Sequence, residues 1–224
     1  MAFLNEKQHA HVTAAVAAAE LKSSGEIVTI TARQSDGYSD IALVWAAIVS
    51  FALLTLLVFI AEPVLHWYGA LHGEWNADWV PYEVFAIAAA TGIVAFLLVW
   101  LAQLWTPLRF ALVPGRVKDA RVQDRAIDLF KVGAESRTQG RTGILIYLSM
   151  AEHRAEILAD EAIASKVDAE VWGEAMHAML AELKEGRIAE GMVAAIDRVG
   201  DVLALHFPRA DDDQNEIPDR LIEL

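Results

Sequence analysis

The sequence contains no cysteine, and that absence removes several chemistries at once. A chain without thiols has no thiol nucleophile, no thiolate metal site and no disulfide framework. It also lacks the H-E-x-x-H zinc motif, the G-x-S-x-G nucleophile elbow and a Walker-type phosphate loop. The net charge of −13 further excludes a nucleic-acid partner, because phosphate binding requires a concentrated cationic face.

Charge is missing altogether from residues 41–61 and 84–108, which are rich in Leu, Val, Ile, Phe and Trp. As helices they would reach roughly 31 and 37 Å, enough to cross a hydrocarbon core of about 30 Å. The alternative is two buried helices of a soluble core, which need more surrounding protein than 224 residues provide. The sequence therefore predicts a transmembrane hairpin with a connecting loop at residues 62–83.

Lys and Arg are absent from this connection, although the chain has 18 of them in total. Loops that face the cytoplasm carry an excess of Lys and Arg, so we expect the loop outside the cytoplasm and both termini inside it. Five basic residues follow the second span and are expected to anchor it and to contact anionic headgroups: Arg109, Arg116, Lys118, Arg121 and Arg125.

The remaining sequence reads as one small domain split by the hairpin. Residues 26–33 are β-branched and alternating, and Gly143–Ser149 is a continuous apolar run, so both are predicted strands that pair with each other. Arg154–Ala159 is a further predicted strand, and helical apolar spacing predicts helices before residue 23, over residues 122–130, between Asp168 and Gly186, and over 187–207. Alternating helices and strands favour an α/β or α+β fold. The predicted division is residues 1–40, 41–61, 62–83, 84–108, 109–208 and an acidic tail at 209–224.

Four polar features are candidate sites. The run Asp211–Asp213 resembles the start of an EF-hand loop, but Ile222 stands where the bidentate Glu belongs, which favours a solvated tail. His9 and His11 lie two apart on a predicted helix, so they face different directions and are read as surface residues. Residues 137–141 either cradle an anion or cap a helix end, and Asp160 with Glu161 either bind calcium or start a helix. In both cases the capping or helix-start interpretation is favoured.

Taken together, several segments resemble the TPM domain family, in particular its bacterial membrane-anchored branch. The resemblance is carried by SSGEIVTI at 23–30, IDLFKVGAESRTQGRTGILIYLS at 127–149, HRAEILADEAI at 153–163, VWGEAM at 171–176, EGRIAEGMVAAIDRVGDVLALHFP at 185–208 and NEIPD at 215–219. It implies a small α/β/α sandwich, here interrupted by the hairpin, and a place in a bacterial inner membrane. The residues themselves indicate no cofactor, whereas the resemblance implies calcium or another divalent ion.

The resemblance also implies two kinds of function, because some relatives are acid phosphatases and others are accessory or repair factors of membrane complexes. The favoured hypothesis is a non-catalytic accessory protein whose domain binds a membrane complex. The competing hypothesis is a metal-assisted phosphatase in which Glu26 and Asp160 bind the metal and Arg141 binds phosphate. Small residues at 88–92 also offer a contact for a homo-oligomer.

Overall fold

The computed structural model describes residues 4–73, 79–135, 142–209 and 217–224. The chain forms two compact units, one made of Met1–Asp36 together with Gly115–Leu224 and the other of Gly37–Pro114. The run Asp211–Asp213 and all of residues 137–141, including Arg141, lie outside the described residues, so the predictions made for them stay predictions.

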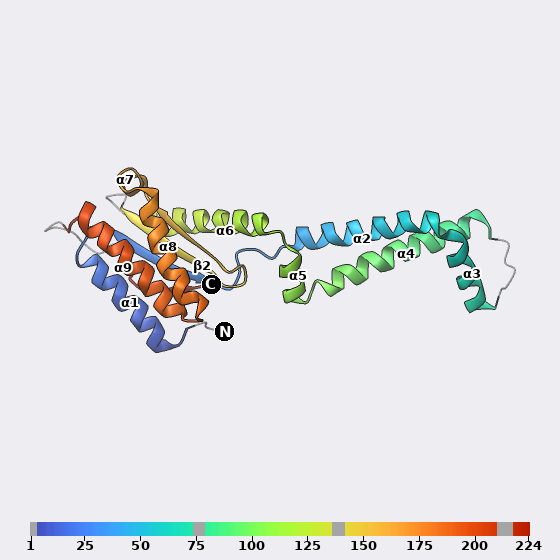
Figure 1. The fold of residues 1–224 in the computed structure, drawn as a ribbon, viewed down its shortest axis with the longest axis horizontal. Coiled ribbons are helices and arrows are strands. Elements are labelled where there is room, and N and C mark those ends of the chain that lie inside the picture. The colour runs from blue at the N-terminus through green and yellow to red at the C-terminus, as the bar shows by residue number, and fades with distance from the viewer. Residues whose placement is uncertain (1–3, 74–78, 136–141, 210–216) are drawn as a thin grey trace. The chain divides into compact units, whose positions relative to one another are not determined.

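The first unit is built on a β-sheet, of which β2 is labelled in Figure 1. The sheet has four strands in the order β3-β2-β1-β4. Strands β1 (Glu26–Ala32) and β2 (Gly143–Ser149) pair in parallel, with Glu26 opposite Gly143 and Ala32 opposite Ser149. The predicted pairing of these strands across the whole Gly37–Pro114 unit is therefore confirmed. Strand β3 (Arg154–Ala159) runs antiparallel to β2, and β4 (Ile222–Glu223) adds in parallel to β1.

Helices cover both faces of this sheet. On one face α1 (Glu6–Glu20), α8 (Ala169–Lys184) and α9 (Ile188–His206) enclose the larger core, into which Ile144, Ile146 and Leu148 point. On the other face α6 (Gly115–Phe130), continued by a turn of π-helix at Lys131–Glu135, packs over Leu145 and Tyr147. The alternation along β2 places successive residues on opposite faces, as a strand buried on both sides requires.

The apolar stripes predicted for the helices form most of the larger core. Val12 and Val16 of α1 and Met192, Ile196 and Leu203 of α9 are fully buried. Two predicted inward residues remain exposed, since Leu180 and Ile222 each retain 37% of their exposure. Leu180 lines a cavity beside the turn between β2 and β3, and Ile222 lies on β4, an edge strand of only two residues.

The second unit consists of α2 (Ser39–Phe59), α3 (Ala61–His72), α4 (Pro81–Ala102) and α5 (Thr106–Leu112). Helix α3 lies in the segment predicted as a connecting loop. Helix α4 ends at Ala102 instead of reaching residue 108. Trp105 has an extended backbone, and Pro107, which has no N–H to donate to the carbonyl four residues before it, lies in the first turn of the next helix. The chain resumes as α5 after a break at residues 103–105.

Helices α2 and α4 pack closely around a glycine. The Ser50 hydroxyl donates to the Gly92 carbonyl at 2.9 Å, and a Cβ atom at Gly92 would lie 3.0 Å from Leu54 Cδ1. Gly92 therefore serves the contact between the two helices of one chain, which is the segment considered above for self-association.

Both of these helices are long and apolar enough to cross a membrane by length and composition. Within the second unit, protein covers little of them, since 17% of the α2 window and 6% of the α4 window are buried. Their exposed side chains include Phe51, Val58, Phe59, Phe85 and Leu98. A soluble core helix would instead be mostly covered by its own protein.

Candidate functional site

Two of the three predicted catalytic residues meet at one edge of the sheet. Glu26 opens β1 opposite Gly143, and Asp160 follows directly after β3, which runs antiparallel to β2 and so ends beside the start of β2. The Asp160 carboxylate accepts a hydrogen bond from the Gly143 N–H at 3.0 Å, and the Asp160 N–H donates to the Gly143 carbonyl at 3.0 Å. The tertiary fold therefore brings Glu26 and Asp160 to either side of Gly143.

Both side chains are buried and accept hydrogen bonds from backbone N–H groups. Glu26 is 6% exposed and accepts a hydrogen bond from the Ile217 N–H at 3.2 Å, while Asp160 is 5% exposed. Asp160 also precedes the short helix α7 (Glu161–Ala164), where its backbone carbonyl accepts from the N–H groups of Ile163 and Ala164. This agrees with the helix-start interpretation of Asp160, although its side chain binds Gly143 and makes no capping hydrogen bond in α7.

A third buried carboxyl, Glu20 at the end of α1, belongs to the same edge. Its Oε1 atom accepts from the Ile27 N–H at 2.8 Å, which ties α1 to β1. Burial raises the pKa of Glu20 from 4.5 to about 8; the Ile27 hydrogen bond opposes this, and the charges of Glu26 and Asp219 add to it. The Glu20 carboxyl is therefore protonated at neutral pH.

Glu20 is not among the predicted site residues, although its position in the sequence carries a signal. Glu20 lies four residues after Val16 and eight after Val12, so it falls on the buried stripe of α1. An acid on the apolar face of a helix indicates a buried, specifically bonded carboxyl.

These carboxyls do not form a recognisable metal centre. No group of three or more His, Cys, Asp or Glu side chains suited to a metal ion occurs within residues 4–73, 79–135, 142–209 and 217–224. Arg141, the third proposed catalytic residue, lies outside that part of the chain. Glu20, Glu26 and Asp160 each accept a hydrogen bond from a backbone N–H group.

The opposite edge of the sheet, where β1 and β2 end, holds a second polar cluster that the sequence did not reveal. The Ser35 hydroxyl lies 2.9 Å from the Tyr147 hydroxyl and donates to Ser149 at 3.0 Å; Ser149 in turn donates to Glu152. Glu152 also accepts from the Ser35 N–H at 2.9 Å. Burial raises the pKa of Tyr147 above its ordinary value of 10.0, so the phenol stays protonated and acts as a hydrogen-bonding group.

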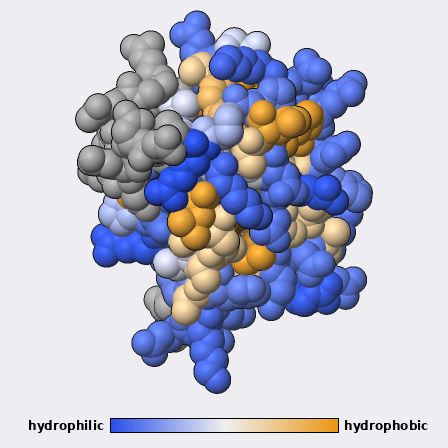
Figure 2. Space-filling view, turned by 90° about the vertical axis from the view of Figure 1, so that its left-hand side faces the viewer, coloured by the Kyte–Doolittle hydropathy of each residue, from blue (hydrophilic) through white to orange (hydrophobic). Residues whose placement is uncertain are grey.

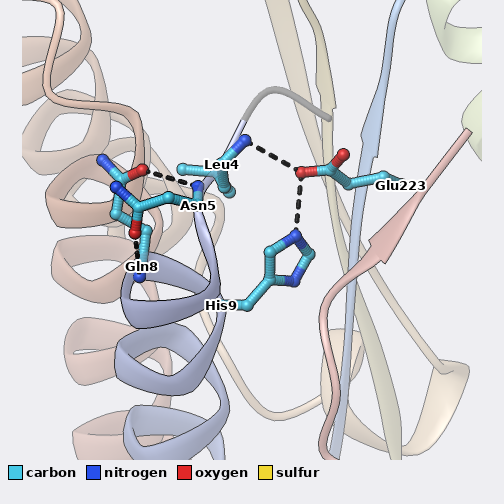
Figure 3. Close-up of polar contacts among 5 residues, drawn as sticks. All are labelled: Leu4, Asn5, Gln8, His9 and Glu223. Carbon is cyan, nitrogen blue, oxygen red and sulfur yellow. Dashed lines mark hydrogen bonds and ion pairs between the residues drawn. The ribbon is translucent and has the colours of Figure 1, made fainter. Parts of the chain in front are cut away.

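The two ends of the chain meet beside this sheet (Figure 3). The Glu223 carboxylate of β4 accepts from the Leu4 N–H at 3.1 Å and lies 2.9 Å from His9 Nε2. Asn5 and Gln8 form a capping box that begins α1. His9 is thus a half-buried structural contact instead of a surface residue, whereas His11 is exposed.

The five basic residues expected to face headgroups belong to both units, and the four on α6 do not share one side of that helix. Arg109 belongs to α5 in the second unit. On α6, the spacing of Lys118, Arg121 and Arg125 at i, i+3 and i+7 places them on one side, and Arg116 falls on the other. Arg121 is half-buried and pairs with Asp36 at 3.2 Å.

Residues 106–202 match the sequence profile of the TPM domain. This segment belongs to the TPM domain family. The matched residues include β2, β3 and Asp160. Strands β1 and β4 belong to the same sheet but lie outside the matched residues.

A solved structure has the same fold. The NMR structure of the BA42 protein from the psychrophilic bacterium Bizionia argentinensis superposes with a TM-score of 0.57 at 18% sequence identity, covering 100% of this chain and 97% of that chain. No curated protein sequence matches the chain. The TPM domain and its fold are thereby assigned, and activity has to be argued from the residues.

Proposed function

We propose that this protein is anchored in a bacterial inner membrane by α2 and α4, and that its TPM domain acts as a non-catalytic accessory factor for a membrane protein complex. The exposed apolar surface of the two helices carries the proposal. Phe59, Val58 and Phe85 retain 80%, 75% and 74% of their exposure. Each large apolar side chain left in water forgoes about 1.5–3 kcal/mol, and lipid recovers that free energy.

The polar groups of the hairpin also suit a lipid environment. The hydroxyls of Ser50, Thr55 and Thr91 donate to backbone carbonyls, and the Gln103 side-chain nitrogen donates to the Ala42 carbonyl at 3.0 Å. A bilayer offers no water to such donors, so internal bonding of these groups suits insertion. The Gln103 Oε1 atom is the exception, since it is buried and accepts no hydrogen bond within the described residues. By contrast, the face of the sheet-containing unit in Figure 2 is mainly hydrophilic, with separate apolar patches.

The proposed orientation follows the basic residues. Lys118, Arg121 and Arg125 lie on one side of α6, and residues 62–83 contain no Lys or Arg. The positive-inside rule then places both termini in the cytoplasm and the connection that holds α3 outside it.

Cysteine labelling tests this arrangement directly, because the natural chain has no thiol to remove. Ala70→Cys in α3 and Ala120→Cys in α6 both alter exposed positions. A membrane-impermeant maleimide added to intact cells should label Cys at position 70, and should label position 120 only after the membrane is opened. Equal labelling of both, or a protein that remains soluble without detergent, contradicts the anchoring.

We favour the accessory role over catalysis because the acids at the sheet edge bind backbone N–H groups. Glu26 and Asp160 are buried and bonded to backbone N–H groups, which is an arrangement that holds the fold together. In-membrane crosslinking before gentle solubilisation, followed by mass spectrometry, should recover a membrane protein in a fixed ratio to this chain. Recovery of this chain alone, with crosslinker titrated to saturation, counts against the accessory role.

A metal-assisted phosphatase remains the second candidate, favoured by one observation, the convergence of Glu26 and Asp160 on Gly143. Arg141 lies two residues before Gly143 in the sequence and would bind the phosphate. The purified full chain in detergent should then hydrolyse a phosphate ester only with a divalent ion, and Asp160→Ala should abolish the activity. Hydrolysis no faster than that of the Asp160→Ala protein removes this candidate.

A further inference from the structure

A cavity of about 400 Å³ lies in the sheet-containing unit, where the turn between β2 and β3 faces the end of α8 and the start of α9. Its walls are mostly apolar and include Leu148, Met150, Leu180, Leu183 and Ile188. The volume falls within the range of about 300–1,000 Å³ that is typical of small-ligand sites. The cavity therefore has the size and lining of a pocket for an apolar group.

Leu180 shows that the core does not fill this space. It lies on the inward stripe of α8, four residues after Met176 and three before Leu183, yet 37% of it remains exposed. A leucine on the core side of a helix loses water contact when a ligand covers it, and that burial favours binding.

The rim of the cavity carries three basic side chains, His153, Arg154 and Lys184. Arg154 is engaged, since its Nε lies 2.5 Å from Asp119 and its Nη1 donates to the His153 carbonyl at 3.1 Å. Within the part of the chain that the structure describes, the side chains of His153 and Lys184 have no hydrogen bond or ion pair. Two basic groups thus face an apolar cavity in a protein of net charge −13.

The nearest acids along the sequence do not neutralise this rim. Glu182 and Glu185 flank Lys184, but both interact with Arg187, at 2.6 and 4.0 Å respectively. Lys184 is therefore available to an anionic group that enters the cavity.

The backbone at the rim is strained. His153 has φ of 54°, a left-handed conformation that side chains other than Gly, Asn and Asp adopt at a cost. Such conformations cluster at ligand-binding sites, where the side chain contributes something that glycine would lose.

We propose that this cavity binds a single acyl chain that ends in an anionic headgroup. The chain would lie against Leu148, Leu180 and Leu183, and the headgroup would contact Lys184 and His153. Because the rim is basic, the cavity should bind an anionic amphiphile more tightly than a neutral one. The inference concerns the sheet-containing unit alone and holds wherever the hairpin resides.

Photocrosslinking with the full chain in phosphatidylcholine nanodiscs tests the proposal. A diazirine analogue of dodecanoate should attach to residues 148–153 and 180–188, as mapped by mass spectrometry. Unlabelled dodecanoate should suppress this labelling, whereas dodecanol should compete about tenfold more weakly because it lacks the charge.

Variants distinguish labelling inside the cavity from labelling by probe dissolved in the bilayer. Leu180→Asp and Lys184→Glu should each reduce labelling of the pocket about tenfold, since both place a carboxylate against the ligand. Leu205→Asp is the matched control, because Leu205 is 77% exposed on α9 and does not line the cavity. Lys184→Glu changes an exposed residue, so the test does not depend on whether Leu180→Asp folds.

The source of the ligand is distinguished by adding phosphatidylglycerol to the nanodiscs. Suppression by this lipid identifies an anionic bilayer lipid as the source, and unchanged labelling identifies a free carboxylate. Labelling confined to α2 and α4, labelling unaffected by Lys184→Glu, or displacement by a peptide with an apolar C-terminus but not by dodecanoate overturns the proposal.

Discussion

The carboxylate of Glu223, next to the last residue of the chain, lies 2.9 Å from Nε2 of His9 on the first helix. The same carboxylate accepts the N–H of Leu4, so one side chain joins the C-terminal strand to the start of α1 (Figure 3). Strand β4 has only two residues, and its pairing with β1 gives it little stability of its own.

We therefore expect Glu223→Ala to loosen β4. The change leaves the Leu4 N–H without its acceptor and should lower the free energy of unfolding by about 1 kcal/mol. Hydrogen exchange at Leu224, whose N–H donates to Thr31, should accelerate before the rest of the sheet opens. His9→Ala should have a smaller effect of the same kind.

His11→Ala provides the control for these two variants, because His11 is exposed on the same helix. It should leave exchange at Leu224 unchanged. Equal acceleration in His9→Ala and His11→Ala would show that helix propensity, and not the contact with Glu223, is responsible.

Glu20 makes stability depend on pH. Its pKa of about 8 in the folded protein exceeds its ordinary value of 4.5. Between these values the native state holds a proton that the unfolded chain has released, so the free energy of unfolding falls as pH rises, by at most about 1.4 kcal/mol per pH unit. The contribution is fully present below the lower pKa and lost as pH rises through the upper one.

Glu20→Gln should remove this slope, because glutamine can still accept from the Ile27 N–H and cannot ionise. Urea unfolding of the full chain in detergent, followed by near-ultraviolet circular dichroism between about pH 5 and pH 8, measures it. Asp197→Asn, at an exposed position of α9, should keep the natural slope. The same slope in Glu20→Gln would assign the pH dependence to another group.

Gly200 is needed where α9 crosses α1. A Cβ atom at this position would lie 2.7 Å from the Cβ of Ala19, closer than two carbon atoms approach without displacement. Gly200→Ala should therefore destabilise the protein by about 1–3 kcal/mol, despite the better helix propensity of alanine. Gly173→Ala is the control, since nothing lies within 4 Å of its Cβ position, and it should stabilise α8 slightly.

His153 should show a trade-off between stability and binding. Glycine adopts a φ of 54° without strain, so His153→Gly should raise the thermal midpoint, by an amount equivalent to at most about 1 kcal/mol. The same variant should bind the dodecanoate analogue more weakly, because the rim loses a basic side chain. A stabilised variant with unchanged labelling would show that His153 takes no part in the cavity.

Several elements of the fold were predictable because they depend on local pattern. The strands Glu26–Ala32, Gly143–Ser149 and Arg154–Ala159 and the inward stripes of α1 and α9 follow from apolar residues repeating with the period of each element. The pairing of β1 with β2 was also predictable, since a single helix and strand cannot bury their apolar faces alone.

The candidate sites were less predictable. Glu26 and Asp160 were predicted as metal ligands, and that role stays a prediction. Their meeting at one edge of the sheet was not predicted, because their bonds to Ile217 and Gly143 depend on segments distant in sequence. The helix α3 and the end of α4 at Ala102 were missed because an uncharged run marks an apolar environment and does not mark where the helix stops.

Apolar periodicity and the absence of charge are properties of the chain, so they predict which residues avoid water. Which polar groups meet depends on the folded arrangement: Glu20 with Ile27, Glu223 with His9, and the basic rim of the cavity beside Leu180. The reason is that burial is a sum over many interchangeable contacts, whereas a hydrogen bond or a ligand pocket requires particular atoms to be brought within a few ångströms of one another.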